Sequence, residues 1–319
     1  MMSEESKGPS VILAAGLTPA WQQILVFDAL RIGEVNRARE AHWCASGKIL
    51  NSGLALHHLG APSLNLAIVG CPQGESMEKE FTALGIPHRW IRSQSPTRSC
   101  TTILDRSSGV STELVQNAEP IRTEELEEFL RLYEDEVRRA RMVILIGSLP
   151  TGTPKTFYRD LMKTTRVRVI LDASGAELLA ALPLKPFCVK PNREELGKTL
   201  GRSLSSDDDL KEAMLHINSL GAEWVVVSQG AKPLWASCAE RIFIFRPPRI
   251  EAVNPIGSGD CLAAGIAWGL YSGMDMPEAI RLGIAAATEN TSMLLPARLD
   301  PGRVRSRVAG ISLERVQHS

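Results

Sequence analysis

The run Met142-Val-Ile-Leu-Ile-Gly-Ser-Leu-Pro150 is the clearest indication of fold class in this 319-residue chain. Five consecutive apolar residues that stop at Gly147 and Ser148 are typical of a strand buried on both faces of a parallel sheet. The preceding segment, 121–141, places apolar residues at helical spacing among charged ones and therefore predicts an amphipathic helix. A buried strand directly after such a helix predicts the repeating unit of an α/β protein.

The same strand and helix patterns continue on both sides of this run. Downstream, the sequence predicts helices near 153–164, 175–182, 193–200 and 207–220, with strands at 167–171, 187–189 and 224–227. Upstream, it predicts strands at 11–15 and 64–69 and helices near 50–59 and 75–84. Repeated βα units predict a three-layer α/β/α sandwich with a mostly parallel central sheet.

Short β-like stretches interrupt the first third of the chain. They lie at 24–27, 39–44, 90–91, 101–104 and 111–115. We expect them to form one small β-sheet, inserted from about 21–45 and 90–116, that covers the site as a lid. The main domain then spans 11–310, between a disordered N-terminus at 1–10 and a C-terminal tail at 311–319. We expect the segment after Pro301 to be solvated.

Composition and charge exclude several classes of protein. The 36 Lys and Arg residues balance 36 Asp and Glu residues, and zero net charge gives no chain-wide attraction to nucleic acid or to an anionic membrane. The six cysteines form no C-x-x-C pair, so zinc-ribbon and thioredoxin spacings are absent. We expect no signal peptide, because the first ten residues are polar and include two Glu, and the sequence contains no run of 18 apolar residues. We therefore expect a cytoplasmic protein without a nucleic-acid or membrane partner.

The segment Asn254-Pro-Ile-Gly-Ser-Gly-Asp260 is the most informative one for function. It precedes an apolar helix, and Gly257, Ser258 and Gly259 bring consecutive backbone amides to the start of that helix, where they form an anion site. Asp260 falls in the first turn. A carboxylate there is either a helix-start residue favoured by the dipole or a general base beside a transferring phosphoryl group.

This segment resembles the carboxy-terminal signature of the PfkB/ribokinase family of sugar kinases, and further blocks resemble that family in the same order. They are Ala45-Ser-Gly-Lys-Ile-Leu-Asn51, 143–152, Lys190-Pro-Asn-Arg-Glu-Glu-Leu196 and Val226-Val-Ser-Gln-Gly230. Gly33-Glu-Val-Asn-Arg37 and Thr97-Arg98 are most similar to the kinases of fructose 1-phosphate, fructose 6-phosphate and tagatose 6-phosphate. The resemblance covers about residues 11–300. It implies a ribokinase-like fold and an ATP- and Mg²⁺-dependent carbohydrate kinase.

The resemblance also implies roles for individual residues. Asp260 would be the catalytic base, and the amides of Gly257, Ser258 and Gly259 would form the anion hole. The substrate-binding residues would be Gln22, Gly47, Lys48, Asn51, Arg98 and Ser148. The ATP-binding residues would be Lys190, Asn192, Ser228 and Gly230, with Glu195 and Asn192 holding Mg²⁺ through water.

Each of these residues also has an ordinary structural interpretation. Asn192 and Glu195 have the spacing of a helix capping box, and Asn51 is a plausible cap. Lys190 and Arg98 could be solvated charges, whereas Ser148 and Ser228 could be turn residues. The local sequence leaves both interpretations open.

Most departures from the family pattern fall among the residues expected to bind the sugar. Gln22 stands where the sugar-phosphate branch has an Asp, Ser46 and Ile49 replace glycines, and Glu289 replaces a small residue near the expected adenine site. We predict phosphorylation of a sugar hydroxyl, with a ketohexose phosphate as acceptor. The alternatives are a catalytically weak sugar-phosphate sensor on the same fold, or a ribose- or nucleoside-type kinase. The lid offers a surface for a homodimer.

Overall fold

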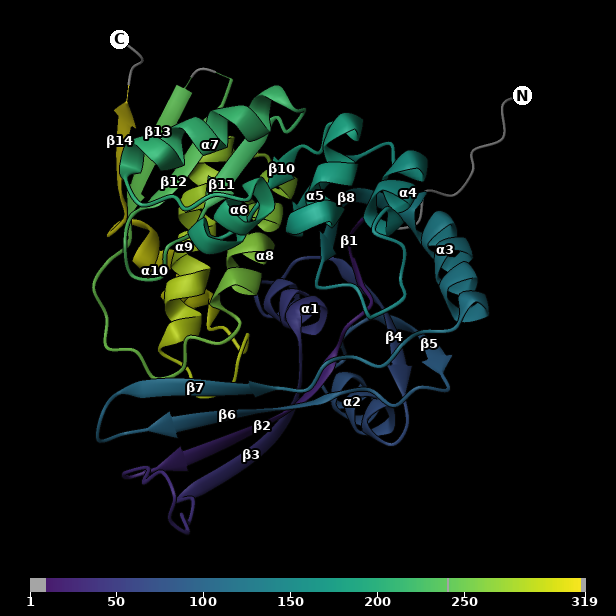
Figure 1. The fold of residues 1–319 in the computed structure, drawn as a ribbon, viewed down its shortest axis with the longest axis vertical. Helices are drawn as coiled ribbons and strands as arrows, with labels where there is room; N and C mark the ends of the chain where they lie inside the picture. Colours follow the sequence, from purple (N-terminus) through teal and green to yellow (C-terminus); the bar gives the residue numbers. More distant parts are fainter. Residues whose placement is uncertain (1–9, 240, 317–319) are drawn as a thin grey trace.

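The computed structural model describes residues 10–239 and 241–316 and contains two sheets of very different size (Figure 1). The large sheet has ten strands and lies between two layers of helices, whereas the small sheet projects from one end of the molecule. This arrangement confirms the predicted three-layer α/β/α sandwich with a small β-sheet lid. None of the described helices is long and apolar enough to cross a membrane.

The strands of the large sheet come from the whole length of the chain. They are β1 (Val11–Gly16), β4 (Ser63–Gly70), β5 (His88–Ser93), β8 (Ala140–Ile146), β9 (Arg168–Asp172), β10 (Cys188–Val189), β11 (Trp224–Val227), β12 (Leu234–Cys238), β13 (Arg241–Arg246) and β14 (Ser312–Val316). Their order is β14-β13-β12-β11-β10-β9-β8-β1-β4-β5. Neighbours from β5 to β11 pair in parallel, and β12, β13 and β14 add antiparallel pairs at one edge.

Each face of this sheet has its own layer of helices. One face carries α1 (Lys48–His58), α2 (Gln73–Ala83), α8 (Ser258–Tyr271), α9 (Met276–Thr291) and α10 (Pro301–Val308). The other carries α3 (Thr123–Val137), α4 (Phe157–Thr164), α5 (Gly175–Ala181), α6 (Arg193–Leu200) and α7 (Asp207–Ser219), with a 3₁₀ turn at Leu182–Leu184.

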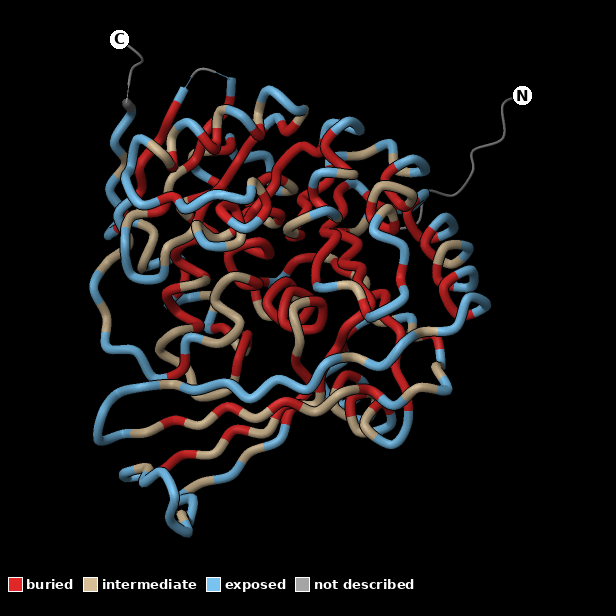
Figure 2. The backbone as a smooth tube through the Cα atoms, in the orientation of Figure 1, coloured by how far each residue is buried: buried red, intermediate tan, exposed pale blue. Residues whose placement is uncertain are grey.

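The alternation of side chains in β1 explains why its sequence is apolar at successive positions. Ile12 and Ala14 lie in the core beneath α1 and α8, whereas Leu13 and Ala15 lie in the core beneath α3 and α4. All four are fully buried, and the buried residues form the centre of the molecule (Figure 2). A strand covered by helices on both faces needs no polar side.

The small sheet, called the lid below, contains four strands in the order β3-β2-β6-β7. They are β2 (Ala20–Phe27), β3 (Glu40–Ser46), β6 (Ser99–Asp105) and β7 (Val110–Val115). One face buries Ile24, Val26, Cys44 and Leu104, which pack near Leu294 and Leu295 of the main body. This inner face carries Gln22 as well, because residues two apart in a strand point to the same side.

Two predicted boundaries are wrong. The stretch 90–91 does not belong to the lid: it lies in β5, which pairs in parallel with β4 at the edge of the large sheet. The second lid segment therefore begins at Ser99. The tail predicted at 311–319 is not free either, because Ser312–Val316 forms β14 and covers the open edge of β13. Residues 1–9 and 317–319, predicted as terminal extensions, lie outside the described part.

Candidate functional site

A chain of hydrogen bonds joins the end of the lid to the start of α8. Gly47 caps α1 with a positive φ of 87°, which a glycine adopts readily, so the backbone turns sharply from β3 into the helix. The Ser46 hydroxyl donates to Asn51 Oδ1 at 3.0 Å, and Asn51 Nδ2 donates to Asp260 Oδ2 at 2.8 Å. Asn51 therefore acts within the site and is not the cap of α1.

Asp260 lies in the first turn of α8 and is buried. Burial raises the pKa of its carboxyl to about 7, although Lys48 and the hydrogen bond from Asn51 both act to lower this pKa. A carboxyl group with a pKa near neutrality exchanges its proton readily at physiological pH. This is the property that a general base requires.

The start of α8 depends on Gly257. Its φ is 82°, and a Cβ atom at this position would lie 3.0 Å from Pro296 Cβ and 3.2 Å from Asn51 Nδ2. The Ser258 amide donates to the Pro255 carbonyl at 3.2 Å, so it is engaged in the turn. Within residues 10–239 and 241–316, the Gly257 and Gly259 amides have no such backbone acceptor. These two amides are the ones available to an anion.

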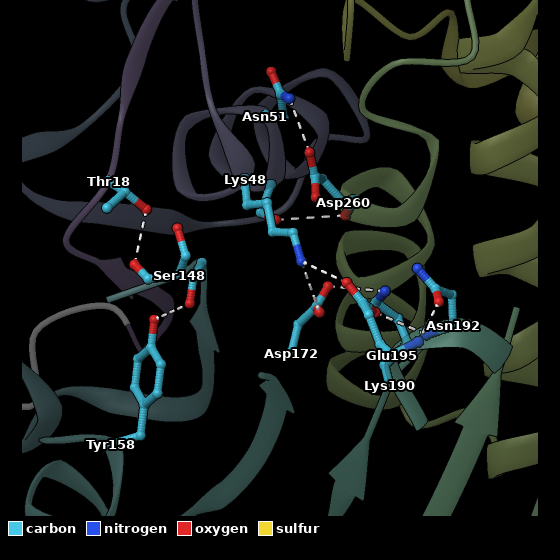
Figure 3. A network of polar contacts seen from close by, with 12 residues as sticks. Thr18, Lys48, Asn51, Ser148, Tyr158, Asp172, Lys190, Asn192, Glu195 and Asp260 are labelled. Carbon is cyan, nitrogen blue, oxygen red and sulfur yellow. Dashed lines mark hydrogen bonds and ion pairs between the residues drawn. The ribbon is translucent and has the colours of Figure 1, made fainter. Parts of the chain in front are cut away.

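Two lysines and two carboxylates form a charged network beside Asp260 (Figure 3). Lys190 Nζ lies 2.8 Å from Asp172 Oδ2, and both side chains are almost fully buried. Lys48 Nζ lies 3.4 Å from Asp172 Oδ1 and 3.5 Å from Glu195 Oε1. Burial opposes the ionisation of Asp172, but Lys190 and Lys48 outweigh it and hold the pKa of this carboxyl below its usual value.

The same lysines lie near the helix start. A Cβ atom built on Gly259 would be 3.5 Å from Lys190 Nζ, which places this ammonium group against the first turn of α8. The Lys190 ammonium group, which Asp172 pairs on one side, and the positive end of the helix dipole therefore meet at the first turn of α8. Such a place can accept an anion with several negative oxygens.

The structure confirms the capping box at the start of α6 and shows a further contact. Asn192 Oδ1 accepts from the Glu195 amide at 2.8 Å, and Glu195 Oε2 accepts from the Asn192 amide at 2.9 Å. The other carboxylate oxygen of Glu195 faces Lys48. Ser228 lies beside Asn192 through a β-bridge, and Gly230 adopts a φ of 62° in the following turn.

The remaining predicted acceptor residues lie around Thr18 and on the lid. Thr18 Oγ1 donates to the carbonyl of Ser148 at 3.0 Å, and its own carbonyl accepts from Arg98 at 3.3 Å. Arg98 also donates to the carbonyls of Pro19 and Gln116 over 3.4 and 3.5 Å. These bonds are long, so the guanidinium is only weakly held.

Gln22 is buried on the inner face of the lid, and its Nε2 donates to Thr102 Oγ1 at 2.8 Å. The amide that replaces the family's carboxylate thus has a partner within the lid itself. In the described part of the chain, no hydrogen bond or ion pair joins Gln22, Arg98 or Ser148 directly to the network around Asp260. The residues predicted to bind the acceptor therefore come from separate elements, which lie at the same end of the large sheet as the network around Asp260.

Sequence reasoning missed Asp172 as a site residue. The sequence carried a signal for it, because Asp172 ends the buried strand β9 at the edge of the sheet where ligands bind. Glu289 also has an explanation: it is fully buried in α9 and lies 2.8 Å from Arg307 of α10. The segment after Pro301 is therefore not simply solvated, since it supplies the counterion of this carboxylate.

Comparisons with known proteins agree with this geometry. The chain matches the model of the pfkB family carbohydrate kinases over residues 22–293. A solved structure described as a possible 1-phosphofructokinase from Thermotoga maritima is 22% identical, with a TM-score of 0.89, over 96% of this chain and 100% of the other. Phosphofructokinase-2 from Escherichia coli with substrates and products is 24% identical, with a TM-score of 0.85, over 94% and 99% of the two chains. The fold is thus ribokinase-like, and because the family model matches most of its length, the chain belongs to the pfkB family of carbohydrate kinases, which transfer a phosphoryl group from ATP to a sugar.

Proposed function

We propose that this protein phosphorylates a hydroxyl group of a sugar, with Asp260 as the general base and the amides at the start of α8 as the anion hole. The observation that carries the proposal is the position of Asp260. Its carboxyl has a pKa of about 7 and lies in the first turn of a helix whose preceding glycine exposes its amide. A base and an anion site are thereby placed within one helical turn of each other.

The residues around Asp260 have different roles in phosphoryl transfer. Asp260 takes the proton of the acceptor hydroxyl, while Asn51 holds the carboxylate in position. The Gly257 and Gly259 amides and Lys190 stabilise negative charge on the transferring group. ATP would supply the phosphoryl group, and Mg²⁺ would neutralise negative charge on the phosphate oxygens. The lid excludes water, which protects the nucleotide from hydrolysis.

The residues present fit a magnesium ion that is held mostly by phosphate and water. No cluster of three or more His, Cys, Asp or Glu side chains suited to a metal occurs in the described part of the chain. However, Mg²⁺ in kinases takes few protein ligands and keeps several waters. Glu195 is partly exposed, and its Oε1 lies 3.5 Å from Lys48 Nζ, so this oxygen can also face a hydrated cation. Glu195 and Asn192 would hold the ion through water.

We propose a ketohexose phosphate as the acceptor. Arg98 supports this choice, because its guanidinium is weakly held at the carboxyl end of the sheet and can pair with a phosphate. The names of the two structural neighbours support it as well, since one is phosphofructokinase-2 and the other is described as a possible 1-phosphofructokinase. Gln22 favours the alternative of a weakly catalytic sensor, because its amide is tied to Thr102. Cytoplasmic placement stays a prediction of the sequence.

An ADP-release assay over a panel of acceptors tests this function. The panel contains fructose 1-phosphate, fructose 6-phosphate, tagatose 6-phosphate, fructose, ribose and adenosine, each with Mg²⁺ and with EDTA. We expect turnover with at least one ketohexose phosphate, and its loss in EDTA. A reaction without acceptor measures ATP hydrolysis. Tight binding of the sugar phosphates without any turnover supports the sensor, and turnover with ribose or adenosine alone contradicts the role of Arg98.

We also propose that the outer face of the lid joins two copies of the chain. Trp43, Val110 and Leu114 are each about half exposed there, and Trp43 stacks on Trp21. A structure of E. coli phosphofructokinase-2 is tetrameric, so this kind of chain assembles in at least one neighbour.

Sedimentation velocity tests the lid interface. The wild type is expected to be a dimer at micromolar concentration, and Leu114→Lys is expected to shift it to monomer, because a charge on an apolar face must be desolvated on association. Leu179→Lys places the same charge at an exposed leucine of α5 and serves as the control. A monomeric wild type, or a Leu114→Lys variant that remains dimeric, would refute this interface.

A further inference from the structure

An ion pair outside the catalytic network binds the backbone of Ala45, just before the turn from β3 into α1. Glu80 of α2 and Arg298, in the loop after α9, form this pair, and both side chains are largely buried. Glu80 Oε2 accepts from the Ala45 amide at 2.6 Å. Arg298 donates to the Ala45 carbonyl through two nitrogens at 3.4 Å each, and to the Pro296 carbonyl at 2.6 Å. The short bond to Glu80 therefore holds the Ala45 amide firmly, and the two longer bonds from Arg298 hold its carbonyl more loosely.

The position of β3 at the edge of the lid explains why the backbone groups of Ala45 need these side-chain partners. It is an edge strand of the lid, so the amide and carbonyl of Ala45 point away from β2 and have no neighbouring strand. Ala45 is nevertheless fully buried. Buried backbone groups without partners are costly, and here an ion pair from two distant segments satisfies them.

The next residues in the chain lead directly to the catalytic base. Ser46 follows Ala45, its hydroxyl donates to Asn51 Oδ1, and this bond turns the Asn51 amino group toward Asp260. Gly47 lies between Ser46 and Asn51 in a tight turn, where an added Cβ atom would come within 2.8 Å of the Ala20 amide nitrogen. The turn therefore has little room to absorb a displacement of Ala45.

We propose that the Glu80–Arg298 ion pair is a positioning element for catalysis: it fixes the Ala45 backbone so that Ser46 and Asn51 present the Asn51 amide to Asp260. This inference rests on the proposed function, because it assigns the pair an effect on the base of that reaction. Neither Glu80 nor Arg298 touches the reacting atoms.

The proposal predicts a change in the titration of Asp260. Its carboxyl faces Lys48 and Asn51 from α1, Asp172 from β9 and Lys190 after β10. Of these groups, only Asn51 has a hydrogen bond to Ser46, so only Asn51 is expected to move when the ion pair is removed. Loss of the Asn51 hydrogen bond removes a stabiliser of the carboxylate, so the pKa of Asp260 rises.

The test compares Glu80→Ala, Arg298→Ala and Glu80→Gln with the wild type. Glu80→Ala and Arg298→Ala are expected to lower kcat about tenfold or more at pH 7 and to move the acid limb of the kcat profile to higher pH. Glu80→Gln keeps an oxygen for the Ala45 amide and is expected to restore part of the loss. Glu78→Ala removes an ion pair with Arg92 from the same helix without contacting β3, and serves as the matched control.

A second measurement separates this proposal from the proposed function. In protein labelled with ¹³C-aspartate, with the Asp260 signal assigned through Asp260→Asn, NMR titration reads the pKa of Asp260 without turnover. An upward shift in Glu80→Ala supports the positioning role even if no acceptor is phosphorylated. If Glu80→Ala loses thermal stability but keeps the wild-type kcat profile and the wild-type Asp260 titration, the pair is merely structural and the proposal is wrong.

Discussion

The Asp260→Asn variant is expected to lose about 10²- to 10⁴-fold in kcat while still binding ATP and acceptor. The substitution keeps the size of the side chain and its hydrogen bond to Asn51, but the amide cannot take a proton. Steady-state kinetics measures the loss, and calorimetric titration of nucleotide and sugar phosphate measures the binding. Asp275→Asn makes the same change at the exposed cap of α9 and is expected to leave kcat unchanged.

The pH dependence of the wild type gives an independent check on this base. The ionised form of Asp260 is the active one and its pKa is about 7, so kcat is expected to fall as the pH falls through 7.

The effect of Asp260 on protein stability changes with pH in the opposite direction to that of most carboxylates. The pKa of Asp260 in the folded protein lies above the usual value of 3.8, so the folded state binds the proton more tightly and this group lowers the free energy of unfolding as the pH rises from 4 to 7. Asp260→Asn is therefore expected to melt at a higher temperature than the wild type at pH 8. Full activity of Asp260→Asn would contradict the assignment.

The sequence predicted the central architecture well because that architecture follows from local patterns. Continuous apolar runs such as 142–146 identify strands buried on both faces, and the glycines before Asp260 identify the start of a helix. Both features depend on neighbouring residues in the chain. The small edge strands were harder, since β5 carries charged residues among its apolar ones and β14 is defined by its pairing with β13.

The parts of the site that the sequence did not predict depend on contacts between distant segments. Lys48 was predicted to bind substrate, and the structure adds its ion pair with Asp172, 124 residues away. Gln22 was recognised as a departure, but its bond to Thr102 follows from lid pairing. Glu289 was unexpected for the family until α10 supplied Arg307. Each of these contacts follows from the tertiary fold and leaves no local periodicity.

The charged network makes Asp172 the residue whose loss should cost the most stability. Asp172 and Lys190 are both nearly fully buried and lie 2.8 Å apart. Asp172→Ala leaves the Lys190 ammonium without its closest counterion, and an uncompensated buried charge costs about 3 kcal/mol or more of unfolding free energy. Urea denaturation monitored by circular dichroism measures this difference. Glu194→Ala removes a fully exposed pair with Lys198 on α6 and is expected to change nothing measurable.

The pH dependence identifies the ion pair as the cause of that loss. The pKa of Asp172 in the folded protein is lowered, so its contribution to stability is present above the unfolded value of 3.8 and disappears as the pH falls through the folded pKa. The difference between wild type and Asp172→Ala is therefore expected to be full at pH 7 and to shrink at pH values well below 4. Asp172→Asn keeps the volume and a hydrogen-bond acceptor for Lys190, so it separates charge from packing. If Asp172→Asn is as stable as the wild type at pH 7, the charge of Asp172 does not hold Lys190 in place, and the network cannot supply the fixed positive charge that we assign to phosphoryl transfer.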